Sequence, residues 1–111
     1  MKLMTKALEK RFEKFPLYSQ EGKSEDETVV VAKFFNPCGA GTWLITEGSL
    51  EEDGDWLLFG IVNLGYGWEW GNVLLSELAS LKGPFGLGIE RDLYLPTGMT
   101  VGEYLRRYDN A

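Results

Sequence analysis

The spacing of apolar and polar residues changes once near the start of this chain, from a helical to a strand-like period. In residues 2–15, apolar side chains recur near i, i+3 and i+4 while Lys and Glu occupy the other positions, which predicts an amphipathic helix. Pro16 ends this helix. Later segments are rich in β-branched and aromatic residues, which favour strands. The predicted strands are 28–35, 42–47, 56–64 and 68–75, with a further strand or extended segment at 89–96.

Two shorter helices complete the pattern. Residues 76–83 predict a helix that Ser76 caps and Gly83 ends. Thr100 and Glu103 have the spacing of a capping box and begin a terminal helix over 100–108. Strands joined by short turns pair antiparallel. The sequence therefore predicts one α+β domain over 1–111, in which a single antiparallel sheet of four to five strands carries N-terminal, middle and C-terminal helices.

Residue composition excludes several kinds of function. The chain has no histidine and a single cysteine, Cys38. Nucleophilic systems that need histidine, histidine-bound zinc and haem sites, and an internal disulfide are all excluded within one chain. We expect no metal and no cofactor.

Charge and hydropathy also limit the partners. The formal net charge is −6, with 17 acidic and 11 basic residues. Phosphates repel such a protein, so direct nucleic-acid binding is not expected, whereas a protein partner with a basic surface is suited to it. No apolar run approaches the ~20 residues of a membrane helix, and the N-terminus lacks the apolar centre of a signal peptide. We expect a cytoplasmic protein without membrane association.

The stretch GWEWG, residues 67–71, is the first candidate site. In a strand, Trp68 and Trp70 share one face and Glu69 points to the other. One interpretation is two core tryptophans beside a solvated glutamate. The alternative is exposed tryptophans that anchor a protein partner, because Trp is enriched at the energetic centres of interfaces.

Acidic residues gather in the turn that separates the second and third predicted strands. As a solvated loop tip they need no function, and as a cluster they form a docking point for a basic partner. The acids are Glu47, Glu51, Glu52, Asp53 and Asp55.

The segment IERD, residues 89–92, is the third candidate. In a strand, Glu90 and Asp92 lie on one face about 7 Å apart, which is in the range of a carboxylate pair in a glycosidase. A hydrolase that uses Glu69, Glu90 or Asp92 is therefore an alternative function. A structural role is the other interpretation, in which Arg91 pairs with an acid on a neighbouring strand.

Several segments resemble a family of small bacterial proteins of unknown function. They are KFFNP, TWLITE, LFGIVNLG, the N-terminal MKLMTKALEKRF and, most specifically, GPFGLGIERDLYLP. Where the family has two glutamates followed by glycine and an aromatic residue, this chain has GYGWEWGNV. Glu69 matches one of those glutamates, and the two tryptophans match nothing in the pattern. The resemblance implies a cytoplasmic accessory protein of plasmids, integrative elements and phages.

Three functions follow as hypotheses. The first is a non-enzymatic, protein-binding accessory of a mobile genetic element, such as an acidic inhibitor of a host nucleic-acid-handling or defence protein. The second is the carboxylate hydrolase. The third is a nucleic-acid accessory, which net charge opposes; it would use Lys2, Lys6, Lys10, Arg11, Lys14, Arg106 and Arg107.

Overall fold

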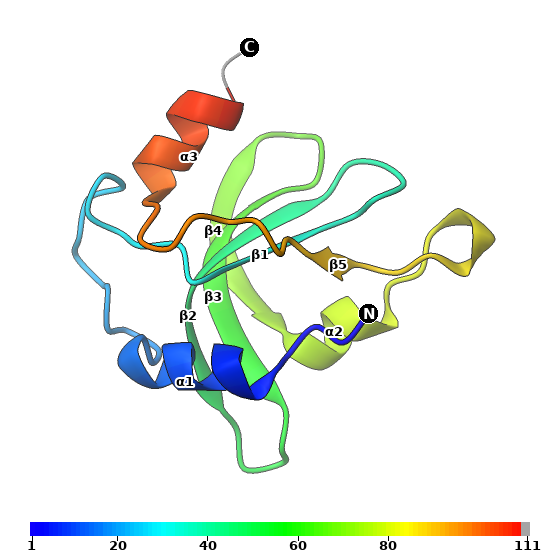
Figure 1. Ribbon diagram of the computed structural model, residues 1–111, viewed down its shortest axis with the longest axis horizontal. Helices are drawn as coiled ribbons and strands as arrows, with labels where there is room; N and C mark the ends of the chain where they lie inside the picture. Colours follow the sequence, from blue (N-terminus) through cyan, green and yellow to red (C-terminus); the bar gives the residue numbers. More distant parts are fainter. Residues whose placement is uncertain (110–111) are drawn as a thin grey trace.

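One antiparallel sheet of five strands forms the centre of the molecule (Figure 1). The structure is a computed structural model that describes residues 1–109, apart from the side chain of Pro84. The strands are β1 Ala32–Phe35, β2 Thr42–Leu50, β3 Trp56–Asn63, β4 Trp68–Leu74 and β5 Glu90–Arg91. The helices are α1 Lys6–Lys14, α2 Leu75–Ser80 and α3 Val101–Tyr108, with a 3-10 turn η1 at Pro84–Gly86. The α+β prediction is confirmed.

The strands lie in the order β4-β3-β2-β1-β5, so β4 and β5 form the two edges. The strand period of two divides the side chains between two faces. The face that we call the α1 face packs against α1 and α2. Its buried residues include Phe12, Ala32, Phe34, Trp43, Ile45, Leu58 and Leu78. The face that we call the α3 face packs against α3 and the residues before it. Its buried residues are Val30, Leu44, Ile61, Met99, Val101 and Tyr104.

Three predicted boundaries were too wide, and local hydrogen bonds explain each one. α1 starts at Lys6 because the Thr5 hydroxyl caps it by accepting the N–H of Leu8 at 3.2 Å. In the predicted strand 28–35, residues 28–31 lie before β1: Val29 forms an isolated bridge with Thr100, and the N–H of Val30 donates to Met99 O. β5 ends at Arg91 because the carboxylate of Asp92 accepts the N–H of Tyr94 and turns the chain.

α2 also differs from its prediction. The helix begins at Leu75 rather than with Ser76 as its cap, and it ends at Ser80 rather than near Gly83. α3 agrees better, since the Thr100 hydroxyl accepts the N–H of Glu103 at 3.2 Å, as expected of the predicted cap. Among the helices of residues 1–109 the longest has nine residues, far short of the ~20 that a bilayer crossing requires.

A β-bulge in β2 changes the direction of one acidic side chain. The register with β3 shifts between Ile45, which lies opposite Gly60, and Glu47, which lies opposite Phe59. In a regular strand Ile45 and Glu47 would both point to the α1 face. The extra residue of a bulge reverses the side-chain alternation beyond it. Glu47 therefore lies on the α3 face, together with Phe59.

Gly60 allows the two strands to approach at this bulge. A Cβ atom built at Gly60 would lie 2.0 Å from the carbonyl oxygen of Leu44 and 2.8 Å from the Cα of Ile45. Both neighbours are backbone atoms, which cannot rotate away as a side chain can. Any other residue at this position must therefore push β2 and β3 apart.

Replacing Gly60 tests this packing against a matched control. Gly60→Ala should lower the free energy of unfolding by about 2 kcal/mol or more, because overpacked sites displace backbone. Gly71 lies directly opposite on β4, and a Cβ there meets nothing within 4 Å. Gly71→Ala should leave stability unchanged or slightly increased. Urea denaturation of both variants measures this, and equal losses of stability would contradict the role given to Gly60.

Candidate functional site

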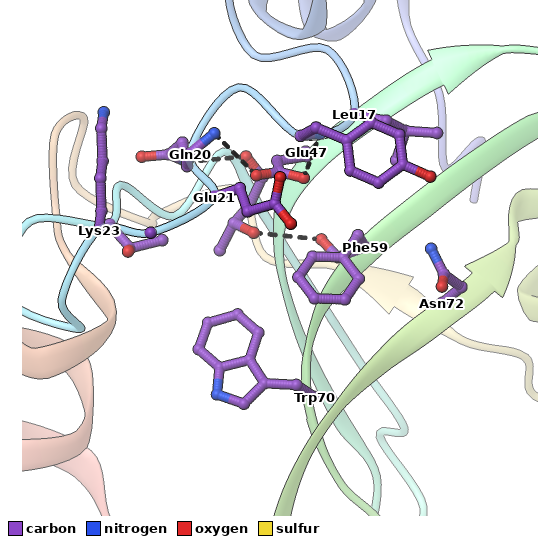
Figure 2. Close-up of a pocket in the computed structure, with 12 residues that line it drawn as sticks. Leu17, Gln20, Glu21, Lys23, Glu47, Phe59, Trp70 and Asn72 are labelled. Atoms are coloured by element: carbon purple, nitrogen blue, oxygen red, sulfur yellow. Dashed lines mark hydrogen bonds between the residues drawn. The ribbon is translucent and has the colours of Figure 1, made fainter.

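A cavity of about 300 Å³ opens on the α3 face, between the sheet and the segment that follows α1 (Figure 2). We call this segment, residues 16–28, the 16–28 loop; it lies on the left of Figure 1. The loop forms one wall of the cavity, and β2, β3 and β4 form the other. The lining residues are Leu17, Tyr18, Gln20, Glu21, Gly22, Lys23, Thr28, Thr46, Glu47, Phe59, Trp70 and Asn72.

The carboxylate of Glu47 joins the two walls. This side chain is only 4% exposed. Its Oε1 accepts the backbone N–H of Tyr18 and its Oε2 accepts the backbone N–H of Gln20, both at 2.8 Å. Hydrogen bonds to a charged group are each worth about 1.5–3 kcal/mol. Glu47 therefore holds the 16–28 loop against β2, and the prediction that it belongs to an exposed acidic cluster was wrong.

The buried side chain of Gln20 adds a second connection. Its Oε1 accepts the N–H of Val29 at 2.8 Å, and its Nε2 donates to the carbonyls of Val29 and Thr46, both at 2.9 Å. Within residues 1–109 no buried side-chain nitrogen or oxygen lacks a hydrogen-bond partner. The loop is thus fastened at both of its ends, and the cavity wall is fixed in place.

Tyr18 has an unusual backbone conformation at the rim of the cavity. Its φ is +73° and its side chain is 74% exposed. A bulky residue in this region costs about 1–3 kcal/mol and persists only where its surroundings impose it. The hydrogen bond from the N–H of Tyr18 to Glu47 is one such constraint. Backbone strain of this kind gathers at functional sites, which marks the rim as a candidate.

Trp70 and Phe59 supply an aromatic surface. Their ring centroids lie 5.6 Å apart with an interplanar angle of 19°, so the rings stack. Trp70 remains 43% exposed. Figure 2 shows its indole across the cavity from the loop, and Glu21 on the loop side. An exposed aromatic face beside a carboxylate is suited to a cation.

The two tryptophans of GWEWG have different environments. Their shared face is as predicted, and Glu69 is exposed on the opposite face. Trp68 is half-buried against α3, where it meets Tyr104 edge-on at 6.3 Å and donates its indole N–H to Asp109 at 2.7 Å. The interpretation as two core tryptophans was therefore wrong for Trp70, because β4 is an edge strand.

The predicted acidic cluster divides into exposed and structural members. Glu51, Glu52 and Asp53 are exposed in the β2–β3 turn and do not line the cavity. The carboxylate of Asp55 instead accepts the N–H and the hydroxyl of Ser76 in the first turn of α2, and the N–H of Trp56 at 2.8 Å. The hydrogen bond from the Ser76 hydroxyl lowers the pKa of Asp55.

Glu69 lies apart from the other two acids considered for catalysis. Glu69 lies on β4 and Glu90 on β5, at opposite edges of the sheet. Asp92 forms an ion pair with Lys33 at 3.4 Å. Arg91 was expected to pair with an acid on a neighbouring strand. Its guanidinium group instead donates to the backbone carbonyls of Lys2 and Leu3.

Sequence reasoning overlooked most of this cavity. The sequence pattern assigned no role to Gln20 or Glu21, and it grouped Glu47 with the acids of the hairpin. One signal was present: Glu47 directly follows the apolar run of TWLIT and precedes a further stretch of strand to Leu50. A charged residue inside a strand, rather than in its turn, indicates either a solvated face or a buried partner.

Comparison with known proteins gives a family without an assigned activity. The model of the family DUF2958, described as a protein of unknown function, matches residues 3–111. No match was found among curated proteins or among solved structures.

The role of Asp55 predicts a pH-dependent effect. Because its pKa lies below the ordinary 3.8 in the folded protein, its contribution to stability is complete above pH 3.8 and is lost as pH falls through the lowered pKa. Asp55→Asn should lower the melting temperature at pH 7, and the difference from the wild type should shrink below pH 3.8. Thermal denaturation across this range measures it.

Glu52→Gln is the matched control, since Glu52 is an exposed acid of the same turn. Glu52→Gln should leave the melting temperature nearly unchanged both at pH 7 and below pH 3.8. Equal effects of the two substitutions at pH 7 would show that Asp55 does not support α2.

Proposed function

Because the chain belongs to the DUF2958 family, whose description carries no activity, we propose from its own surface that it binds a protein with a basic surface and is not an enzyme. The proposed contact is a Lys or Arg side chain of the partner in the cavity beside Trp70. The observation that carries this proposal is the exposed Trp70, stacked on Phe59, in a cavity that Glu21 and Glu47 also line.

The chemistry of the cavity favours a cationic group over other side chains. A guanidinium or ammonium group above the face of a tryptophan gains about 0.5–1 kcal/mol when exposed and about 2 kcal/mol when desolvated. Glu21 adds an opposite charge at the rim. Lys23 also lines the cavity, but Figure 2 shows its ammonium group directed away from the aromatic rings. We therefore assign the partner's cation to the side of the cavity that Trp70 and Glu21 line.

The size of the cavity fits a side chain better than a cofactor. Pockets for small molecules have volumes of about 300–1,000 Å³, and this cavity, at about 300 Å³, is at the lower limit. It is open toward solvent rather than enclosed. One long side chain that remains attached to a partner can enter it without leaving a large void.

The net charge of −6 supports the approach of such a partner. Charges spread over a surface accelerate association with an oppositely charged protein, and this acceleration weakens with salt. The exposed acids Glu51, Glu52 and Asp53 extend in the β2–β3 turn, away from the cavity. We assign them to this long-range attraction and assign the specific contact to the cavity.

The cellular role is a narrower proposal that rests on the resemblance to proteins of plasmids, integrative elements and phages. In that context the partner is a host protein that handles nucleic acids or defends the host. The surface of such a protein that binds phosphate is basic. An acidic protein that occupies this surface would inhibit its partner by competition.

Capture of a partner tests the proposed function. The immobilised protein is exposed to lysate of a bacterial host, and the proteins that it retains are identified and then purified for titration. We expect a basic partner whose affinity falls at least tenfold with Trp70→Ala or Glu21→Lys, because the first removes the aromatic face and the second the opposite charge. Retention should also fall as salt rises.

Glu13→Lys is the control for net charge, since Glu13 is exposed on α1 and does not line the cavity. It changes the charge by the same amount as Glu21→Lys and should preserve most of the affinity. Recovery of no specific partner, or an equal loss with Glu13→Lys, would contradict the assignment of binding to this cavity.

A further inference from the structure

The two edge strands of the sheet differ in how well they are protected against pairing with a further strand. The edge strand β5 has only two residues, and the N–H of Arg91 already donates to the sulfur of Met1 at 3.1 Å. The edge strand β4 has seven residues and contains neither proline nor lysine. Short strands, prolines and charged side chains, lysine above all, are the usual protection of an edge against further pairing. Of these, β4 has only the single charge of Glu69.

One hydrogen bond shows which residues of β4 direct their backbone N–H and C=O groups away from β3. In an antiparallel ladder, the N–H and C=O groups of alternate residues point toward the neighbouring strand and away from it. The N–H of Leu74 donates to the carboxylate of Glu77 rather than to β3, so Leu74 belongs to the outward set. Asn72 and Trp70 belong to the same set. Within residues 1–109, their N–H groups have no partner outside the sheet.

A second cavity lies on the other side of the same edge. It has a volume of about 310 Å³ and is on the α1 face, where its lining includes Trp43, Val62, Tyr66 and Gly71. A Cβ at Gly71 would meet nothing within 4 Å, so the floor there is open. Trp70 and Asn72 line both cavities. The open edge thus runs between two hollows on opposite faces.

We infer that the partner binds as an additional β-strand along β4, an inference that rests on the proposed function. In strand addition, backbone hydrogen bonds provide affinity and pockets for alternate side chains provide specificity. The occupant is an extended basic segment. Its Lys or Arg side chain lies on the α3 face above Trp70, and its next side chain, which is apolar, lies in the hollow over Gly71.

Charge selects this occupant over a second copy of the chain. Glu69 lies exposed on β4, and Glu21 borders the cavity on the other face. Pairing β4 with another β4 would join two chains of net charge −6, each with Glu69 exposed on the paired strand. Like charges across a strand pair are destabilising, whereas a basic segment neutralises these acids.

Peptides of defined sequence test the inference. The probe is an acetylated and amidated Thr-Thr-Val-Arg-Val-Thr-Thr, which places Arg on one face and two valines on the other. One control peptide carries N-methyl groups on the residues that would donate to β4, and a second has Gln in place of Arg. Amide proton and nitrogen spectra of the whole chain follow each titration.

With the Arg peptide, we expect the amide protons of Trp70 and Asn72 to move downfield, as they do on forming hydrogen bonds. The N-methylated peptide should bind at least tenfold more weakly. Equal binding of the N-methylated peptide would overturn strand addition and leave the cation site intact. Equal binding of the Gln peptide, with loss only on N-methylation, would support strand addition and contradict the cation site.

Two further outcomes would overturn the inference. One is that millimolar Arg peptide shifts neither amide. The other is that both amides shift with protein concentration alone, which would show that a second copy of the chain occupies β4.

Discussion

The buried carboxylate of Glu47 is the constraint on which the candidate site depends. Removing a charged carboxylate from water costs several kcal/mol unless hydrogen bonds compensate for it. Here the N–H groups of Tyr18 and Gln20 compensate, one for each oxygen. The charge can be buried only while the 16–28 loop lies against β2, so the position of the loop and the burial of the charge stabilise each other.

This arrangement originates in the packing of β2 on β3. The absence of a side chain at Gly60 lets the bulge form, and the bulge turns Glu47 from the α1 face to the α3 face. There the carboxylate meets the 16–28 loop, which becomes the wall opposite Trp70. Burial of Glu47 thus fixes one wall of the cavity in which we propose that a cationic side chain binds. The open edge of β4 adds backbone hydrogen bonds beside that cavity.

More of the fold than of the candidate site could be predicted from the sequence. Local signals act through neighbouring residues, so the caps at Thr100 and the apolar runs of β2 and β3 were identified correctly. The direction of Glu47 depends on Gly60, 13 positions away, and on a register that only the assembled sheet fixes. Asp55 and Glu52 are acids of the same predicted turn, so the sequence did not distinguish them. Only the folded chain brings Asp55 to Ser76, where its carboxylate supports the first turn of α2. Trp70 followed the strand alternation, but its exposure depends on β4 being an edge.

Hydrogen exchange at two backbone amides tests the central role of Glu47 most directly. If its carboxylate holds the 16–28 loop, the N–H groups of Tyr18 and Gln20 exchange about as slowly as those of β2, because both are bonded to a buried charge. Gly22 is an exposed residue of the same loop, and its N–H should exchange far faster. Rapid exchange of Tyr18 and Gln20, at the rate of Gly22, would show that the loop is not fastened and that the cavity has no fixed wall.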